Sequence, residues 1–172
     1  MSWARVPTEV ALPLAHLTLR GQAWGDSAAP PLLALHGWLD NAASFSELAP
    51  LLATRYLVIA LELAGHGHSD HLPAGAEYHY LGHVQMVRAA ADALRLSRYT
   101  LLGHSLGAGI ASLIAAAEPE RIERLLLIEG LGPLGDDGSR TLQRFREALA
   151  THRESSRSLR VFRDVAQAVN AR

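Results

Sequence analysis

The sequence predicts an α/β fold, a doubly wound and mostly parallel sheet with helices on both faces. Four short segments are apolar almost throughout, as is typical of strands buried on both faces: residues 31–35, 56–63, 99–102 and 125–128. Helical patterns separate these segments, which favours parallel pairing through right-handed crossovers. Apolar residues make up 49% of the 172 residues, enough for a sizeable core.

The other elements follow from local patterns. Residues 10–24 are interpreted as one or two short strands. An S-x-x-E sequence at residues 44–47 reads as a capping box and predicts a helix through Leu52. Residues 106–117 predict a helix that ends at Glu118-Pro119. Another helix is predicted by apolar residues at three- and four-residue intervals, namely Leu81, Val84, Val87, Ala91 and Leu94.

The character of the chain changes after Gly135. Two amphipathic helices are predicted there, one around Phe145 and one from Phe162 to Val169, and they form an excursion from the sheet. Residues 139–172 hold eight arginines and three acidic residues, whereas residues 1–138 hold eight arginines and fourteen acidic residues. A basic tail could bind an anionic partner. We prefer a solvated helix face, because apolar residues at helical spacing separate the arginines.

Composition excludes several function classes. The chain has no cysteine, which removes disulfides, thiolate metal sites and a cysteine nucleophile, and no lysine, which removes Schiff-base chemistry. The net charge of −1 gives no reason to expect nucleic acid or a membrane as a partner. The N-terminus lacks a signal-peptide pattern, so we expect a cytoplasmic protein. Arginine without lysine indicates a GC-rich, bacterial-type genome.

The strongest chemical signal is the G-x-S-x-G sequence Gly103-His104-Ser105-Leu106-Gly107. It lies between a predicted strand and a predicted helix, the setting of a nucleophile elbow, so we expect strained backbone at Ser105 and an exposed, nucleophilic hydroxyl. Side chains at Gly103 and Gly107 would collide with the neighbouring strand and helix. His104 points elsewhere from the turn and is not expected to be the base. A serine at an ordinary helix N-cap is the disfavoured alternative.

A second signal, His36-Gly37-Trp38-Leu39-Asp40-Asn41, ends the strand at residues 31–35. Beside a nucleophile elbow, a loop at this point supplies one backbone N–H of the oxyanion hole, and the residue after the nucleophile supplies the other. We assign these to Trp38 and Leu106. Gly37 allows a close approach of the chain, and the Trp38 indole could line the acyl pocket. Without the nucleophile elbow, we would interpret this sequence as an ordinary turn at the end of a strand.

A third signal, Gly65-His66-Gly67-His68-Ser69-Asp70, contains an H-x-H pair that could suggest a metal. No further histidine or carboxylate has supportive spacing, so we expect a tight structural loop and no metal site.

These motifs resemble the α/β-hydrolase superfamily. HGWLDNAASF at residues 36–45 and GHSLGAG at residues 103–109 are most similar to its serine hydrolase-like group. The resemblance covers most of residues 10–135, and it implies a partial α/β-hydrolase core over residues 1–135 and the start of a helical cap over residues 136–172. The family's glycine-rich loop usually has Asp where this chain has Glu62, a position that normally supports structure.

The family's triad runs Ser, then Asp or Glu, then a His after the final strand. Glu129, directly after residues 125–128, is the candidate acid, and its alternative role is to cap the loop around Gly130. His152 is the only later histidine, and it lies in a cap-like helix. We therefore expect a fragment that lacks the catalytic His and is inactive alone, with residues 125–128 as a bare apolar edge.

The resemblance implies a serine hydrolase that acts on a small-molecule, ester-like or related acyl bond through an acyl-enzyme on Ser105, without cofactor or metal. Two alternatives stay open. The chain could be a non-catalytic binding domain that kept the fold, since a fold does not imply a function. It could also use the same elbow for cofactor-free perhydrolysis or C–C bond hydrolysis.

Overall fold

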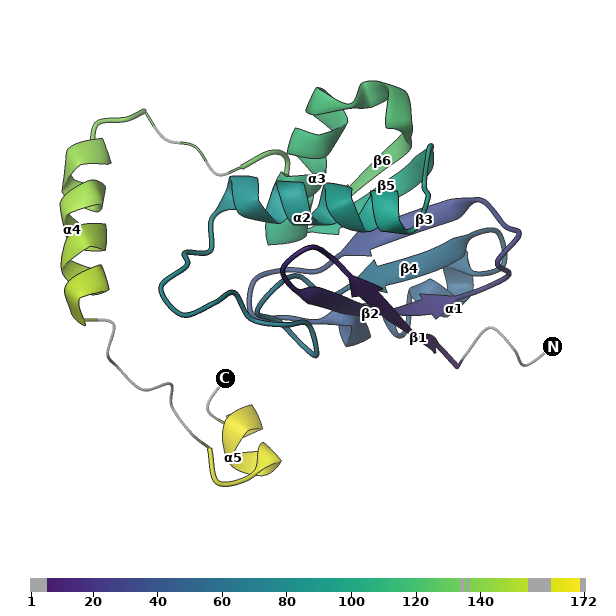
Figure 1. The fold of residues 1–172 in the computed structure, drawn as a ribbon, viewed down its shortest axis with the longest axis horizontal. Helices are drawn as coiled ribbons and strands as arrows, with labels where there is room; N and C mark the ends of the chain where they lie inside the picture. The colour runs from purple at the N-terminus through teal and green to yellow at the C-terminus, as the bar shows by residue number, and fades with distance from the viewer. Residues whose placement is uncertain (1–5, 134, 136, 155–161, 171–172) are drawn as a thin grey trace. The chain divides into compact units, whose positions relative to one another are not determined.

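The computed structural model describes residues 6–133, 135, 137–154 and 162–170. Six strands form one sheet in the order β1-β2-β4-β3-β5-β6 (Figure 1). Strands β3 to β6 pair in parallel, while β1 and β2 add an antiparallel hairpin at one edge. The strands are β1 (Thr8–Pro13), β2 (Thr18–Trp24), β3 (Pro31–Leu35), β4 (Leu57–Leu61), β5 (Tyr99–His104) and β6 (Ile122–Ile128).

Helices cover both faces of the sheet, as the apolar strands predict. In β3, Leu33 and Leu35 belong to the core shared with α2 (Tyr80–Ala93) and α3 (Leu106–Ala117), and these two helices pack side by side in Figure 1. Leu32 and Ala34 belong to the opposite core, with η1 (Ala42–Phe45, a 3₁₀ helix) and α1 (Ala49–Leu52). A second 3₁₀ helix, η2 (Pro119–Arg121), joins α3 to β6. The doubly wound architecture is confirmed.

The predicted capping box at residues 44–47 is wrong. Asn41 caps η1 instead, since its side-chain oxygen accepts a hydrogen bond from the N–H of Ala43 at 2.9 Å. The Ser44 hydroxyl donates to the Asp40 carboxylate. Helix α1 starts without a side-chain cap, and Pro50 occupies its first turn, where no N–H is needed.

Helix α2 buries the predicted face except at Leu81. Val84, Val87 and Ala91 are buried as expected, but Leu81 is 62% exposed. The ring of His83 is buried in its place. The apolar periodicity could not show this, because histidine does not count as an apolar residue.

Strand β6 lies at the end of the sheet order, as predicted for a bare edge. Leu125, Leu126 and Ile128 are 37%, 41% and 43% exposed. Large apolar side chains on an edge strand are an available surface for further packing.

Residues 1–134 and 135–172 form two separate compact units. The second contains α4 (Thr141–Glu154) and α5 (Val165–Asn170), near the two predicted amphipathic helices. Phe162 precedes α5 instead of belonging to it. Across the described ranges, no helix combines the length and the apolar character that a membrane span requires.

Candidate active site around Ser105

Ser105 lies at a sharp turn between β5 and α3, as the G-x-S-x-G sequence predicts. Its φ of 50° and ψ of −111° place a residue with a side chain in a region that costs about 1–3 kcal/mol. The N–H of Ser105 donates to the carbonyl of Ile128 at 3.0 Å, which ties the turn to the end of β6. The strained backbone is therefore held by the neighbouring strand.

Gly103 and Gly107 allow the turn to pack against its neighbours. A Cβ at Gly103 would lie 2.3 Å from the carbonyl oxygen of Gly107 and 2.6 Å from Cα of Ala108 in α3. A Cβ at Gly107 would lie 2.3 Å from the carbonyl oxygen of Leu35 in β3. Because these are backbone atoms, they cannot rotate away, and the predicted collisions with helix and strand are confirmed.

The loop after β3 passes directly beside Ser105. A Cβ at Gly37 would be 3.4 Å from Cβ of Ser105 and 3.1 Å from Nδ1 of His104. Leu106 is the first residue of α3, so its N–H has no carbonyl partner within the helix. The N–H groups of Trp38 and Leu106 thus come from the two segments next to Ser105, and their role as an oxyanion hole stays a prediction.

A cavity of about 380 Å³ brings most of the predicted site residues together. Its lining includes Trp38, Ser105, Leu106 and Glu129. The loop of residues 129–132, which begins with the predicted Glu129, completes one side of this cavity. Tyr80, the first residue of α2, also lines it and was not predicted, because no motif contains it.

Glu129 follows β6 with a φ of 55°, a second strained residue beside the cavity. Its carboxylate Oε2 lies 3.1 Å from Nε2 of His104. His104 itself lines a different hollow, of about 240 Å³, with Asp40 and Phe45. The expectation that His104 points away from the Ser105 site agrees with this placement, and Glu129 pairs with His104 instead of capping the loop at Gly130.

The glycine-rich loop at residues 65–70 has a structural role. The Glu62 carboxylate accepts a hydrogen bond from the N–H of His68 at 2.6 Å, and the Ser69 hydroxyl donates to the Glu62 carbonyl at 2.7 Å. Asp70 accepts from the N–H of Thr18 at 2.7 Å, which attaches the loop to the start of β2. Glu62 thus supports this loop, which is the structural role that the resemblance implies for this position.

Three buried histidines lie behind Trp38. The His66 ring packs edge-on against Trp38 at 5.3 Å between ring centres, and it also lies 5.1 Å from His36 and 6.4 Å from His83. Nε2 of His36 accepts from the N–H of Leu63, so the proton is on Nδ1. In the described part of the chain, no group of three or more His, Asp or Glu side chains is arranged to hold a metal.

Burial keeps two of these histidines neutral. It lowers the pKa of His36, and it lowers the pKa of His83 to about 4. The packed rings of the cluster support the loop that carries Trp38. Sequence reasoning missed the cluster because its members come from three separate segments.

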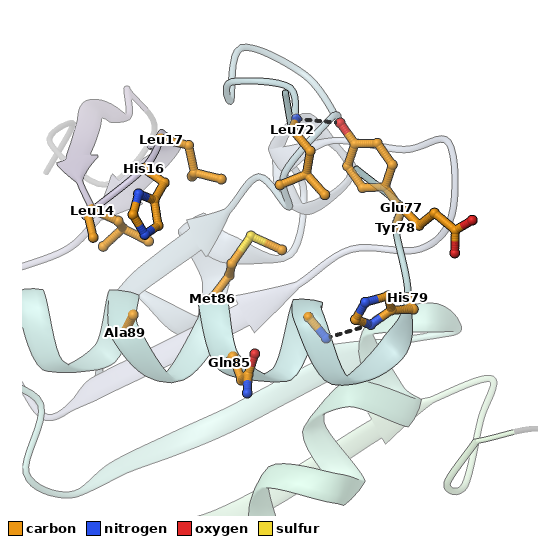
Figure 2. A pocket seen from close by; sticks show the side chains of 12 residues that line it. Leu14, His16, Leu17, Leu72, Glu77, Tyr78, His79, Gln85, Met86 and Ala89 are labelled. Carbon is orange, nitrogen blue, oxygen red and sulfur yellow. Dashed lines mark hydrogen bonds between the residues drawn. The ribbon is translucent and has the colours of Figure 1, made fainter. Parts of the chain in front are cut away.

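A second cavity, of about 320 Å³, lies between the β1–β2 turn and α2 (Figure 2). Figure 2 shows Leu17, Leu72 and Met86 around its apolar interior and His79 near the start of the helix, where the N–H of Gly82 donates to Nδ1 of His79. None of the predicted site residues lines this cavity, so the predicted chemistry lies elsewhere.

The family model described as "alpha/beta hydrolase fold" matches residues 30–159, which is more than half of the chain. The chain belongs to the α/β-hydrolase family. Among curated relatives of this α/β-hydrolase chain, the serine hydrolase-like protein of Danio rerio is 38% identical over 128 residues, which are 74% of this chain and 39% of the relative. The serine hydrolase-like protein of Homo sapiens is 37% identical over 121 residues, 70% of this chain and 59% of the relative.

Two solved structures resemble this α/β-hydrolase chain closely. A hypothetical protein from Pseudomonas aeruginosa PAO1 is 43% identical, with a TM-score of 0.88 over 95% of this chain and 58% of that protein. The thioesterase domain from the curacin biosynthetic pathway is 30% identical, with a TM-score of 0.79 over 96% of this chain and 60% of that domain. The α/β-hydrolase chain therefore spans about two fifths to three fifths of the length of these relatives.

A serine nucleophile in this α/β-hydrolase chain needs a neighbouring base that takes its proton. No histidine is among the described residues that line the Ser105 cavity. His152 lies in α4, and its side chain is outside the described part of the structure.

Proposed function

We propose that this chain carries the nucleophile of a serine hydrolase that cleaves an ester-like or related acyl bond. The observation that carries the proposal is the backbone of Ser105, which is strained between β5 and α3 at the wall of a cavity. Strain of this kind in a residue with a side chain persists where surrounding structure enforces it, and it gathers at functional sites. The serine hydrolase-like names of the relatives support the same chemistry.

In the proposed reaction, Oγ of Ser105 attacks the acyl carbon and forms a new C–O bond. The carbonyl oxygen becomes an oxyanion that accepts hydrogen bonds from the N–H groups of Trp38 and Leu106. As the intermediate collapses, the bond to the leaving group breaks, and the leaving group takes the proton that Ser105 lost. Water then hydrolyses the acyl-enzyme, which releases the acid and restores the serine.

The proton transfers need a base, and we propose that a histidine outside residues 1–172 supplies it. The greater length of the relatives supports this proposal. Glu129 would orient that histidine and stabilise its cation. The carboxylate is suited to the role because it is 77% exposed and can leave His104 for a new partner. We also propose that residues 136–172 begin a helical cap over the complete enzyme.

Two observations favour a second candidate, a non-catalytic binding domain. Glu129 already has a partner in His104, and the described lining of the Ser105 cavity holds no histidine. A chain that had lost its catalytic base but kept its pocket would show the same two features.

Reaction with an activated phosphonate separates the two candidates. A full-length protein that contains this sequence should label at Ser105 much faster than free serine does, and a Ser105→Ala variant should not label. Labelling no faster than that of free serine would favour the binding domain. A panel of esters, peracid-forming reactions and C–C substrates then separates ester hydrolysis from perhydrolysis and C–C bond hydrolysis.

A further inference from the structure

Tyr80 reaches the Ser105 cavity from a helix that carries none of the predicted site residues. It is the first residue of α2, and its side chain lines the cavity together with Ser105 and Leu106. Helices α2 and α3 pack against each other on one face of the sheet (Figure 1). Tyr80 is 36% exposed, so it forms a wall of the cavity that a ligand can touch.

Gly109 in α3 provides the space in which this ring lies. A Cβ at Gly109 would be 2.9 Å from both Cε1 and Oη of Tyr80, closer than real Cβ atoms come to a neighbour. The φ of Gly109 lies outside the left-handed region, so its backbone does not require glycine. A glycine within a helix costs about 1 kcal/mol relative to alanine. A Cβ at this position would meet the outer end of the Tyr80 side chain, which can shift, so a substitution of Gly109 is a means of moving the ring.

The described lining of the cavity is suited to an uncharged and apolar group. Two aromatic rings, of Trp38 and Tyr80, and two leucines, Leu106 and Leu131, contribute to it. The one charged side chain in this described lining is the carboxylate of Glu129. A negatively charged substrate group would be repelled by Glu129 and would find no cation among these residues. Aromatic rings also favour a flat aromatic partner, by about 0.5–1.5 kcal/mol beyond burial.

We propose that Tyr80, seated on Gly109, determines the acyl specificity of the Ser105 site, and that the site prefers an uncharged aromatic acyl group over one that carries a carboxylate. This inference rests on the proposed function. Tyr80 is a specificity-determining residue here, with no part in proton transfer.

The test is the ratio of labelling rates for two fluorophosphonates that differ in one substituent, phenyl or carboxyalkyl. In both reactions Oγ of Ser105 bonds to phosphorus, fluoride leaves and the serine proton passes to solvent. A full-length protein that contains this sequence is incubated with each probe, and mass spectrometry follows the modified Ser105 peptide. We expect the phenyl probe to react at least tenfold faster.

Two variants and a control test whether the ratio of labelling rates depends on the Tyr80 ring. Gly109→Ala pushes the Tyr80 ring into the cavity and should lower the phenyl preference about tenfold, the effect of a moderate overpacking penalty. In a Tyr80→Ala background the same Gly109→Ala change should alter the ratio less than twofold. Gly82→Ala, in α2 and 3.4 Å from the His79 ring, should leave the ratio unchanged. Circular dichroism shows that each variant is folded.

Four results would overturn the inference. Equal effects of Gly109→Ala with and without Tyr80 would show that the ring is not what Gly109 accommodates. Faster reaction of the carboxyalkyl probe would exclude the proposed substrate class. Failure of both probes to label Ser105 would overturn the proposed function as well, and this differs from labelling without a preference, which overturns the specificity alone.

Discussion

Gly107→Ala tests whether the nucleophile turn depends on close backbone contact. The added Cβ would lie 2.3 Å from the carbonyl oxygen of Leu35 and 2.8 Å from that of His36, in the neighbouring strand and loop. Overpacking of this kind costs about 1–3 kcal/mol. A movement of Gly107 that relieves these contacts also stretches the 3.1 Å hydrogen bond from its N–H to the carbonyl of His36. Such a hydrogen bond is worth about 1 kcal/mol.

Helix propensity acts in the opposite direction. Alanine is favoured over glycine by up to about 1 kcal/mol within a helix, so the net destabilisation expected for Gly107→Ala is about 1–3 kcal/mol. Gly82→Ala is the matched control in α2, since its Cβ meets the His79 ring at an ordinary 3.4 Å. That variant should be more stable than the parent by up to about 1 kcal/mol.

Urea unfolding of residues 1–172, followed by circular dichroism, gives both changes in the free energy of unfolding. Changes of opposite sign are expected for the same substitution in two helices. If Gly107→Ala is as stable as the parent or more stable, helix propensity outweighs the backbone contact, and the packing argument for the turn is wrong.

Three further outcomes are expected. In a full-length protein that contains this sequence, Glu129→Gln should lower kcat by about 10²–10⁴ without lowering Tm, and unchanged turnover would place the acid elsewhere. Residues 1–172 alone should hydrolyse an activated aryl ester no faster than their Ser105→Ala variant does; a rate that Ser105→Ala abolishes would reveal a base, with His152 the first residue to mutate. Burial lowers the pKa of His83 to about 4, whereas histidine in an unfolded chain titrates near 6.5. Between these values the unfolded state binds more protons, so stability should fall by roughly 3 kcal/mol as pH drops from 6.5 to 4. His83→Phe should flatten this dependence in urea titrations, and an unaltered slope would assign it to other groups.

The parts of the fold that the sequence predicted are those where one signal dominates. Strand β3 has its expected bounds because a continuous apolar run stops at His36-Gly37, and α3 has its expected bounds because Ser105 and Glu118-Pro119 delimit it. The capping box failed because Ser44 lies within η1, which Asn41 caps, and the Ser44 hydroxyl donates to Asp40. Local sequence does not show that a separate 3₁₀ helix precedes α1.

In the candidate site, too, the sequence predicts some residues and not others. Ser105, Trp38, Leu106 and Glu129 follow strand ends, and parallel strands bring their carboxyl ends to one edge of the sheet. Tyr80 could not be predicted in this way, because its place in the cavity depends on how two helices pack on one face of the sheet. The buried histidines behind Trp38 could not be predicted either, because they come from three separate segments.

A crystal structure of the phosphonate adduct of a full-length protein that contains this sequence tests the central claim most directly. The account predicts phosphorus bonded to Oγ of Ser105 and a phosphonyl oxygen about 2.7–3.1 Å from the backbone nitrogens of both Trp38 and Leu106. An adduct on another serine, or a phosphonyl oxygen that contacts neither N–H, would contradict the assignment of Ser105 and its oxyanion hole.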